Sequence, residues 1–370
     1  MGVTVCYDFQ IFVDQLYGGI SRYIYELAQR VNRADGFSSK VLAPLYKNRY
    51  LRPEDSFVRG FPLPGAPENR RIYRAVNWIS SPLVDRFAGA DLLHETYYQL
   101  RTIPLRRKVV VLTVHDMIHE RFRALFPSND DTVLRKKAAI RRADQIICVS
   151  ESTRRDLLEY FDLPESKVAV VHHGFNPTSG GDLPAPTTVM PDRPFLLYVG
   201  DRKKHKNFEG LLRAYATSPW LSKEFALVCF GGGAFDVDEL LALKKYGGRE
   251  GSVVYAGCSD LILFALYRQA TAYVCPSKYE GFGIPLLEAM YSGCPVACSN
   301  TGSLPEVAGD AALYFDPYDP ESIREVLEYL ALSESKRAEL TLHGRRRAAL
   351  FSWDKCATET MALYRRTLGV

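Results

Sequence analysis

The feature that most constrains the fold is a repeated alternation of short apolar runs with segments of helical periodicity. The run VVVLTV at 109–114 is apolar on both faces, which is typical of a central strand in a parallel sheet. Apolar residues in the segment 20–31 recur at the spacing of a helix with one buried face. Because strand and helix alternate along most of the chain, we predict parallel sheets covered by helices.

A change in composition divides this alternation into two halves. The segment 176–194 is rich in Pro, Gly, Ser and Thr, as linkers are, and PFLLYVG then restarts the alternation. A chain of 370 residues also exceeds one ordinary core. We therefore predict an α/β protein of two doubly wound, Rossmann-like domains facing a central cleft. The expected boundaries are a first domain over 1–180 completed by a C-terminal helix over 352–370, a linker over 181–193, and a second domain over 194–351.

Composition and charge exclude several classes of protein. With 47% hydrophobic residues and a net charge of +4, the chain is neither disordered nor a gross nucleic-acid binder. Basic residues concentrate at 101–142, and the segment RRIYRAVNW at 70–78 is also basic. These stretches are compatible with an anionic membrane surface or substrate, although a solvated helix face explains a charge run equally well.

Cysteine usage and hydropathy bear on the compartment. The eight cysteines form no CxxC pair, and most lie in or beside strand-like apolar runs, where cysteine acts as a small hydrophobic residue. This usage suits a reducing compartment. No apolar run approaches the roughly 18 residues needed to span a bilayer. We expect a cytoplasmic protein, at most peripheral at the inner face of a membrane.

The stretch KYEGFGIPLLEAMYSG at 278–293 carries two acids, Glu280 and Glu288. Glu280 follows a strand-like run, and ligands of open parallel sheets bind beyond the carboxyl ends of the strands. The glycines would let the backbone turn tightly toward a ligand. The N–H groups of Phe282, Gly283 and Ile284 would then bind anionic oxygens at the start of a helix. Both carboxylates could accept hydrogen bonds from sugar hydroxyls, although acids at this place also complement the helix dipole.

A cationic loop precedes this stretch. In LLYVGDRKKHKN at 196–207, a strand-like run is followed by Arg202, Lys203, Lys204 and Lys206. Cations at the carboxyl end of a strand suit a diphosphate, whereas a solvated loop is the alternative. Together, the basic loop and the two acids predict a site for a nucleotide diphosphate sugar.

The first half contributes two further candidates. His115 directly follows the strand-like run at 109–114, where it could contact a sugar or shuttle a proton, although a lone histidine is more often structural. Gly19 opens the first long helix, which could bind an anion or could simply need a flexible turn. In the same half, Ser152 is expected to cap the helix that follows DQIICVS.

These motifs resemble those of the GT-B glycosyltransferases of family 4, a retaining class with many mannosyl- and glucosyltransferases. The resemblance covers essentially the whole chain and is carried by YGGISRY, LTVHD, PSKYEGFGIPLLEAM, the long run PVACSNTGSLPEVAGDAALYFDP and the FSW-led final helix. It implies transfer of a mannose- or glucose-type hexose from a GDP- or UDP-linked donor to a saccharide or lipid-linked saccharide in surface polysaccharide synthesis. No cofactor and no metal are expected.

The resemblance also implies roles for single residues. Glu288 would bind the donor ribose, and Glu280 with the amides after it would hold the donor sugar. Lys206 and Arg202 would hold the diphosphate, whereas His115 would act beside the anomeric centre. Gly19 would help to close the phosphate pocket. The first domain would handle the acceptor, and the base would lie near 257–260.

The sequence departs from the family pattern at one point, and other functions remain to be weighed. Asp201 stands where many members have arginine, which leaves open whether Arg202 or Lys204 is the leading cation. Asp236 and Asp238 form an acid-x-acid triplet, but N-capping of a helix explains it better than a metal. No GxGxxG supports an oxidoreductase. The remaining alternative is a GT-B sugar-nucleotide-binding protein or epimerase without transferase activity.

Overall fold

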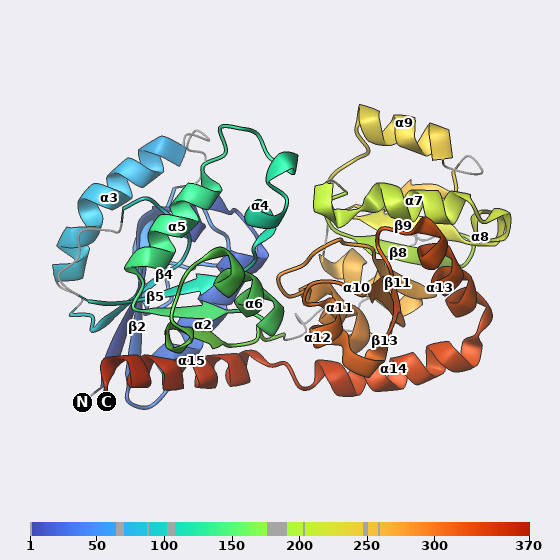
Figure 1. Cartoon of the computed structure of the whole chain (residues 1–370). Helices are drawn as coiled ribbons and strands as arrows, with labels where there is room; N and C mark the ends of the chain where they lie inside the picture. The colour runs from blue at the N-terminus through green and yellow to red at the C-terminus, as the bar shows by residue number, and fades with distance from the viewer. Residues whose placement is uncertain are drawn as a thin grey trace. The chain divides into compact units, whose positions relative to one another are not determined.

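The chain forms two compact units in the computed structural model (Figure 1). Unit 1 comprises Met1–Gly174 and Ser352–Val370, and unit 2 comprises Phe175–Phe351. The structure describes residues 2–63, 70–86, 89–101, 108–175, 191–202, 204–246, 251–257 and 260–370. The expected linker over 181–193 therefore lies largely outside the described residues, as do residues 258 and 259 of the segment expected to lie near the base.

Unit 1 is built on a seven-stranded, all-parallel sheet in the order β3-β2-β1-β4-β5-β6-β7. Its strands are β1 (Val3–Tyr7), β2 (Phe37–Tyr46), β3 (Val58–Pro62), β4 (Leu92–Glu95), β5 (Val109–Val114), β6 (Gln145–Cys148) and β7 (Val168–Val170). Its helices are α1 (Gln10–Asp14), α2 (Gly19–Arg33), α3 (Arg70–Arg86), α4 (Ile118–Arg121), α5 (Thr132–Arg142), α6 (Glu151–Tyr160) and α15 (Trp353–Leu368).

Unit 2 is built on a six-stranded, all-parallel sheet in the order β10-β9-β8-β11-β12-β13. Its strands are β8 (Phe195–Val199), β9 (Ala226–Phe230), β10 (Val253–Tyr255), β11 (Ala272–Cys275), β12 (Val296–Ser299) and β13 (Ala312–Phe315). Its helices are α7 (Phe208–Ala216), α8 (Pro219–Glu224), α9 (Val237–Tyr246), α10 (Asp260–Gln269), α11 (Ile284–Tyr291), α12 (Leu304–Ala308), α13 (Pro320–Leu332) and α14 (Glu334–Ala348).

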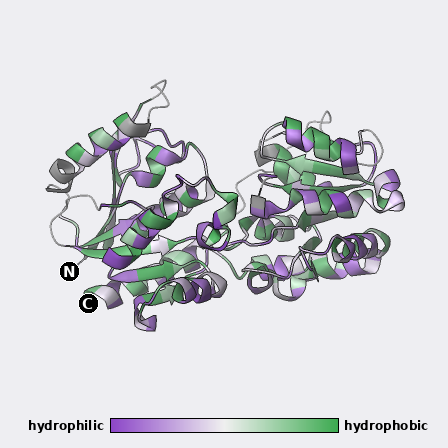
Figure 2. Ribbon diagram, turned by 45° about the horizontal axis from the view of Figure 1, so that its top comes forward, coloured by the Kyte–Doolittle hydropathy of each residue, from purple (hydrophilic) through white to green (hydrophobic). Residues whose placement is uncertain are grey.

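Both units therefore have the doubly wound α/β architecture that the alternation predicts. Figure 2 shows mainly hydrophobic strands, whereas the helices mix hydrophobic and hydrophilic residues. The structure adds three strands that the sequence analysis did not assign, β3, β4 and β13. It also moves one helix boundary: Ser150, not Ser152, caps α6 by accepting a hydrogen bond from the Thr153 N–H. The described cysteines are all free and buried, in keeping with their expected role in the core.

Helix α15 completes the core of unit 1, although it lies at the far end of the chain. It packs alongside α2 (Figure 1), and five of its residues belong to the hydrophobic core of β1, β2 and α2. A buried hydrogen-bond chain fixes it further. The Tyr364 hydroxyl lies 2.6 Å from Nδ1 of His94 on β4, and Nε2 of His94 lies 2.8 Å from the Thr113 hydroxyl on β5. Burial lowers the pKa of His94 to about 3, so this histidine is neutral near pH 7.

We predict that unit 1 loses stability on mild acidification partly through His94. The unfolded chain protonates this residue near its ordinary pKa of about 6.5, whereas the folded chain does not. Stability is therefore present above about pH 6.5 and is lost as the pH falls toward 3. Between pH 7.5 and 5.5, protonation of this residue in the unfolded chain lowers the free energy of unfolding by about 1.4 kcal/mol. Urea unfolding of wild type and His94→Gln at both pH values measures it: the variant should lose less stability, and an equal loss would contradict the prediction.

Candidate functional site

The acid-bearing loop of unit 2 begins where β11 ends. Glu280 Oε1 lies 2.7 Å from Lys206 Nζ and accepts a hydrogen bond of 2.6 Å from the Ser277 hydroxyl. Burial acts to raise the pKa of Glu280, but the charge of Lys206 and the bonds from Lys206 and Ser277 outweigh it and hold the pKa below its ordinary value. The side chain is 14% exposed. Glu280 is thus an ionised, nearly buried acceptor fixed in one orientation.

Two loops from neighbouring strands are joined at this point. Strands β8 and β11 pair in parallel, so the loops that follow them leave the same edge of the sheet. The Lys278 N–H donates to the His205 carbonyl at 2.8 Å, and Nδ2 of Asn207 donates to the Pro276 carbonyl at 3.1 Å. Asn207 adopts a left-handed backbone conformation with a φ of 55°. These bonds hold Lys206 against Glu280 and explain why an asparagine follows the lysine.

A third loop supports Glu280 from the other side. After β12, the Ser303 hydroxyl donates a hydrogen bond of 2.9 Å to the Glu280 carbonyl, and the Thr301 hydroxyl donates to the Lys278 carbonyl at 3.0 Å. Gly302 lies between them with a φ of 61°, and a Cβ there would lie 3.0 Å from the same Glu280 carbonyl oxygen. The sequence analysis missed Ser277, Ser303 and Asn207 as supporting residues. The signal that could have found them was their position after a strand end within the quoted motif runs, not any chemistry of their own.

The second acid, Glu288, lies in the middle of α11. Gly283 is the N-cap of this helix with a φ of 96°, and Pro285 occupies its first turn. The backbone N–H groups of Gly283 and Ile284 have no hydrogen-bond acceptor within the described ranges, and they mark the positive end of the helix dipole. Glu288 is half-buried on this helix and accepts a hydrogen bond from the buried Tyr267 hydroxyl at 3.3 Å. The motif therefore places the positive end of a helix dipole between two carboxylates in the sequence.

Arg202 bonds to the loop that follows β9. Each of its three guanidinium nitrogens already donates a hydrogen bond, to Glu239 and to the carbonyls of the glycine turn that follows β9, including Gly231 at 2.7 Å. Its side chain is 1% exposed and stacks on the Phe235 ring. In this arrangement Arg202 anchors the glycine turn and does not join Lys206. A contact between Arg202 and a diphosphate stays a prediction, and no side-chain position is described for Lys204.

The acid-x-acid triplet forms the helix cap that the sequence predicts. Asp236 Oδ1 accepts from the Glu239 N–H at 2.9 Å, and Glu239 Oε2 accepts from the Asp236 N–H at 2.8 Å. This reciprocal pair is a capping box at the start of α9. Among the residues that the structure describes, no group of three or more His, Cys, Asp or Glu is placed to hold a metal ion.

The two candidates of the first half lie in unit 1, apart from the unit 2 group in the chain. His115 follows β5 and is 7% exposed, with its ring stacked on His173 at a centroid distance of 5.5 Å. Neither ring nitrogen of His115 has a hydrogen-bond partner among the described residues. Burial, then His94 and Lys136, lower its pKa to about 3, so the imidazole is neutral near pH 7. Gly19 is the first residue of α2, and no atom lies within 4 Å of where its Cβ would be.

Comparison with known proteins identifies the family and the fold. The family model described as "Glycosyltransferase Family 4" matches residues 17–179, and the model "Glycosyl transferases group 1" matches residues 183–347. The O-antigen chain mannosyltransferase B of Escherichia coli is 33% identical over 276 residues, which are 71% of this chain and 72% of that protein.

Two solved structures are similar along the whole chain. A sucrose-phosphate synthase from Thermosynechococcus elongatus has a TM-score of 0.76 at 21% identity, with 99% of each chain covered. HepE from Anabaena, solved in complex with UDP-glucose, has a TM-score of 0.71 at 16% identity, covering 97% of this chain and 99% of that one. Sequence and fold thus agree, and the chain belongs to the family 4 glycosyltransferases and has the GT-B fold.

Proposed function

We propose that this glycosyltransferase moves a mannose- or glucose-type hexose from a GDP- or UDP-linked donor to a saccharide or lipid-linked saccharide acceptor, with retention of configuration at the anomeric carbon. The observation that carries the proposal is the Lys206–Glu280 pair at 2.7 Å, beside the N-terminus of α11. Two similar proteins support the proposed classes of substrate: one is named as a mannosyltransferase of O-antigen chains, and another was solved with UDP-glucose.

The donor is divided among the groups of unit 2 by their charge. Lys206 and the N–H groups of Gly283 and Ile284 are positive and take the diphosphate. An ionised carboxylate accepts hydrogen bonds but cannot donate them. Glu280 therefore binds hydroxyl groups of the hexose, and Glu288 binds those of the ribose. Because Lys206 and the helix end offer positive charge to the diphosphate, we propose that transfer needs no metal and no cofactor.

His115 contributes as a neutral group. An imidazole with a pKa near 3 does not take up a second proton at neutral pH, so of the two roles expected from the sequence, contact with the sugar fits better than a proton shuttle. A neutral ring offers one N–H donor and one acceptor, which suits a sugar hydroxyl at the reacting end of the donor. Gly19 is proposed to leave room for the phosphate at the start of α2, where its Cβ position is open.

We propose that unit 1 binds the acceptor. We also propose that unit 1 contacts an anionic membrane. Helix α3 exposes Ile72, Val76 and Ile79 together with the half-exposed Arg74. No helix in the described part of the chain is long and apolar enough to cross a bilayer.

We predict that the chain sediments with vesicles that contain phosphatidylglycerol and much less with neutral vesicles, because the exposed Lys137 and Arg141 on α5 add attraction to an anionic surface. Co-sedimentation at low and moderate salt measures this. Equal binding to both kinds of vesicle would remove membrane contact from the proposal.

We predict that Lys206→Ala and Glu288→Ala each weaken binding of the donor nucleotide sugar about tenfold or more. Each change removes a partner that a charged or hydroxyl group of the bound donor needs. Titration calorimetry with GDP-mannose and UDP-glucose measures the affinity. Lys223→Ala, a 77% exposed lysine of the same unit, is the matched control and should bind as wild type does. Unchanged affinity in both site variants would place the donor elsewhere.

We predict that Glu280→Gln and His115→Ala still bind the nucleotide but lose turnover by about two orders of magnitude or more, the scale of a positioned polar group in transfer reactions. Steady-state rates with a saturating donor measure the loss. Near-normal rates would exclude both residues from the reaction. Donor binding without any transfer or hydrolysis in wild type would instead favour the alternative, a sugar-nucleotide-binding protein without transferase activity.

A further inference from the structure

A lysine of unit 1, Lys136 on α5, is unusual because its side chain is 0% exposed. A buried ammonium group is costly unless charged and polar partners surround it. Replacing a buried ion pair by apolar residues of similar volume is often neutral or even stabilising. Stability alone therefore does not account for a lysine at this position, and its partners suggest another role.

The ammonium group of Lys136 is bound by the segment that follows β5. Its Nζ donates a hydrogen bond of 2.7 Å to Oε2 of Glu120 on α4, whose side chain is 3% exposed. The same Nζ donates a hydrogen bond of 2.9 Å to the backbone carbonyl of Asp116. The first bond balances the charge of the lysine. The second fixes the main chain immediately after His115, the candidate catalytic residue.

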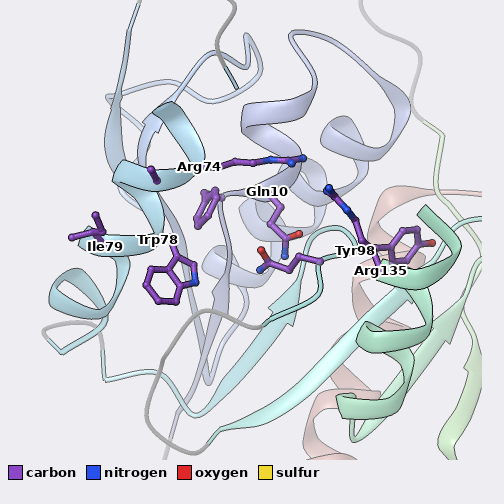
Figure 3. Close-up of a pocket in the computed structure, with 9 residues that line it drawn as sticks. Gln10, Arg74, Trp78, Ile79, Tyr98 and Arg135 are labelled. Carbon is purple, nitrogen blue, oxygen red and sulfur yellow. The ribbon is translucent and has the colours of Figure 1, made fainter. Parts of the chain in front are cut away.

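A further contact of Lys136 leads to the backbone amide of His115 itself. Nζ lies 5.2 Å from the centroid of the Tyr98 ring, within the range of a cation–π interaction. The Tyr98 hydroxyl accepts a hydrogen bond of 3.3 Å from the His115 N–H. Tyr98 lines the cavity drawn in Figure 3, where it lies beside the helix that carries Arg135, the chain neighbour of Lys136. Lys136 thus acts on the backbone at two successive residues.

The imidazole of His115 depends on this backbone support. Neither of its ring nitrogens has a hydrogen-bond partner among the described residues. The ring is held by packing instead, edge-on against Tyr23 and stacked on His173. Because no hydrogen bond to a described side chain fixes the ring, its direction follows the main chain at the end of β5. A displacement of about 1 Å in a reacting group can lower a rate about 100-fold.

We propose that Lys136 is a positioning residue for His115. It acts directly through the Asp116 carbonyl and indirectly through Tyr98. The inference rests on the proposed function, in which His115 contacts the hexose at its reacting end. Lys136 itself is buried and paired with Glu120, so it touches no substrate. Loss of the lysine should therefore lower turnover and leave the affinity for the donor, which is bound by unit 2, unchanged.

The test uses a neutral pair to separate positioning from stability in the full-length chain. Lys136→Met alone leaves the Glu120 carboxylate buried without its cation and should melt at a lower temperature. Lys136→Met combined with Glu120→Met removes both charges at similar volume and should melt near the wild-type temperature. The double variant should nevertheless turn over about tenfold or more slowly than wild type. Release of GDP from GDP-mannose or of UDP from UDP-glucose, with water as the acceptor, measures turnover, and titration calorimetry measures donor affinity.

Two further variants keep the test decisive. Ile140→Ala removes a buried side chain one turn further along α5 and is the control for lost stability. It should melt earlier than wild type but keep wild-type turnover at temperatures where it is folded. Tyr98→Phe keeps the ring but removes the hydroxyl that holds the His115 N–H, so it should also slow turnover at unchanged donor affinity.

His115→Ala, assayed with the same donors, distinguishes failure of this inference from failure of the proposed function. Slow turnover by His115→Ala, with wild-type turnover by the neutral double variant or by Tyr98→Phe, would overturn the positioning role alone. A loss of donor affinity that matches the loss of turnover in the double variant would overturn it as well. Near-normal turnover by His115→Ala would instead overturn the role of His115 in the proposed function, and the positioning role with it.

Discussion

The desolvated carboxylate of Glu280 is the constraint on which the donor site depends. A nearly buried anion is costly unless a cation and hydrogen-bond donors accompany it. Here Lys206 and Ser277 supply both, and each comes from a loop whose backbone is fastened to its neighbour. The positions of Asn207 and Gly302 follow from the same requirement, because they let three loops meet at one sheet edge without a gap.

In unit 1, buried neutral side chains are positioned by hydrogen bonds as well. Its buried histidines are held uncharged by the surrounding core, and the chain from Tyr364 through His94 to Thr113 ties the C-terminal helix to two central strands. The Tyr23 hydroxyl continues this chain at 3.1 Å from Thr113, and its ring packs edge-on against His115 at 5.5 Å. The orientation of the candidate catalytic ring thus depends on residues from both ends of the sequence.

The sequence predicts the architecture well because parallel strands buried on both faces are continuous apolar runs, and VVVLTV could be little else. The sequence also predicts motifs whose partners are close in the chain: Asp236 caps α9 by bonding to the N–H of Glu239, three residues later. It fails at β4, where LLHE looks like a polar loop. His94 and Glu95 are buried there only because Tyr364 and Arg142, distant in sequence, provide their partners. The pairing of Arg202 with Glu239 is hidden in the same way, since Glu239 lies 37 positions away and no local pattern predicts the pair.

The residues that support Glu280 could not be predicted from the sequence for a related reason. Ser277 and Ser303 are small polar residues of a kind found in most loops, and only the folded backbone shows that both converge on Glu280. The sequence reveals a site residue when a charged side chain directly follows an apolar strand. It does not reveal common polar residues whose role depends on contacts with residues distant in the sequence.

Hydrogen–deuterium exchange of the full-length chain with and without a saturating nucleotide sugar tests the central claim most directly. The account predicts slower exchange of the backbone amides at 277–288, where the helix end and both acids would contact the donor, and at 204–207. Protection confined to other segments, with these amides unchanged by a donor that binds, would contradict it.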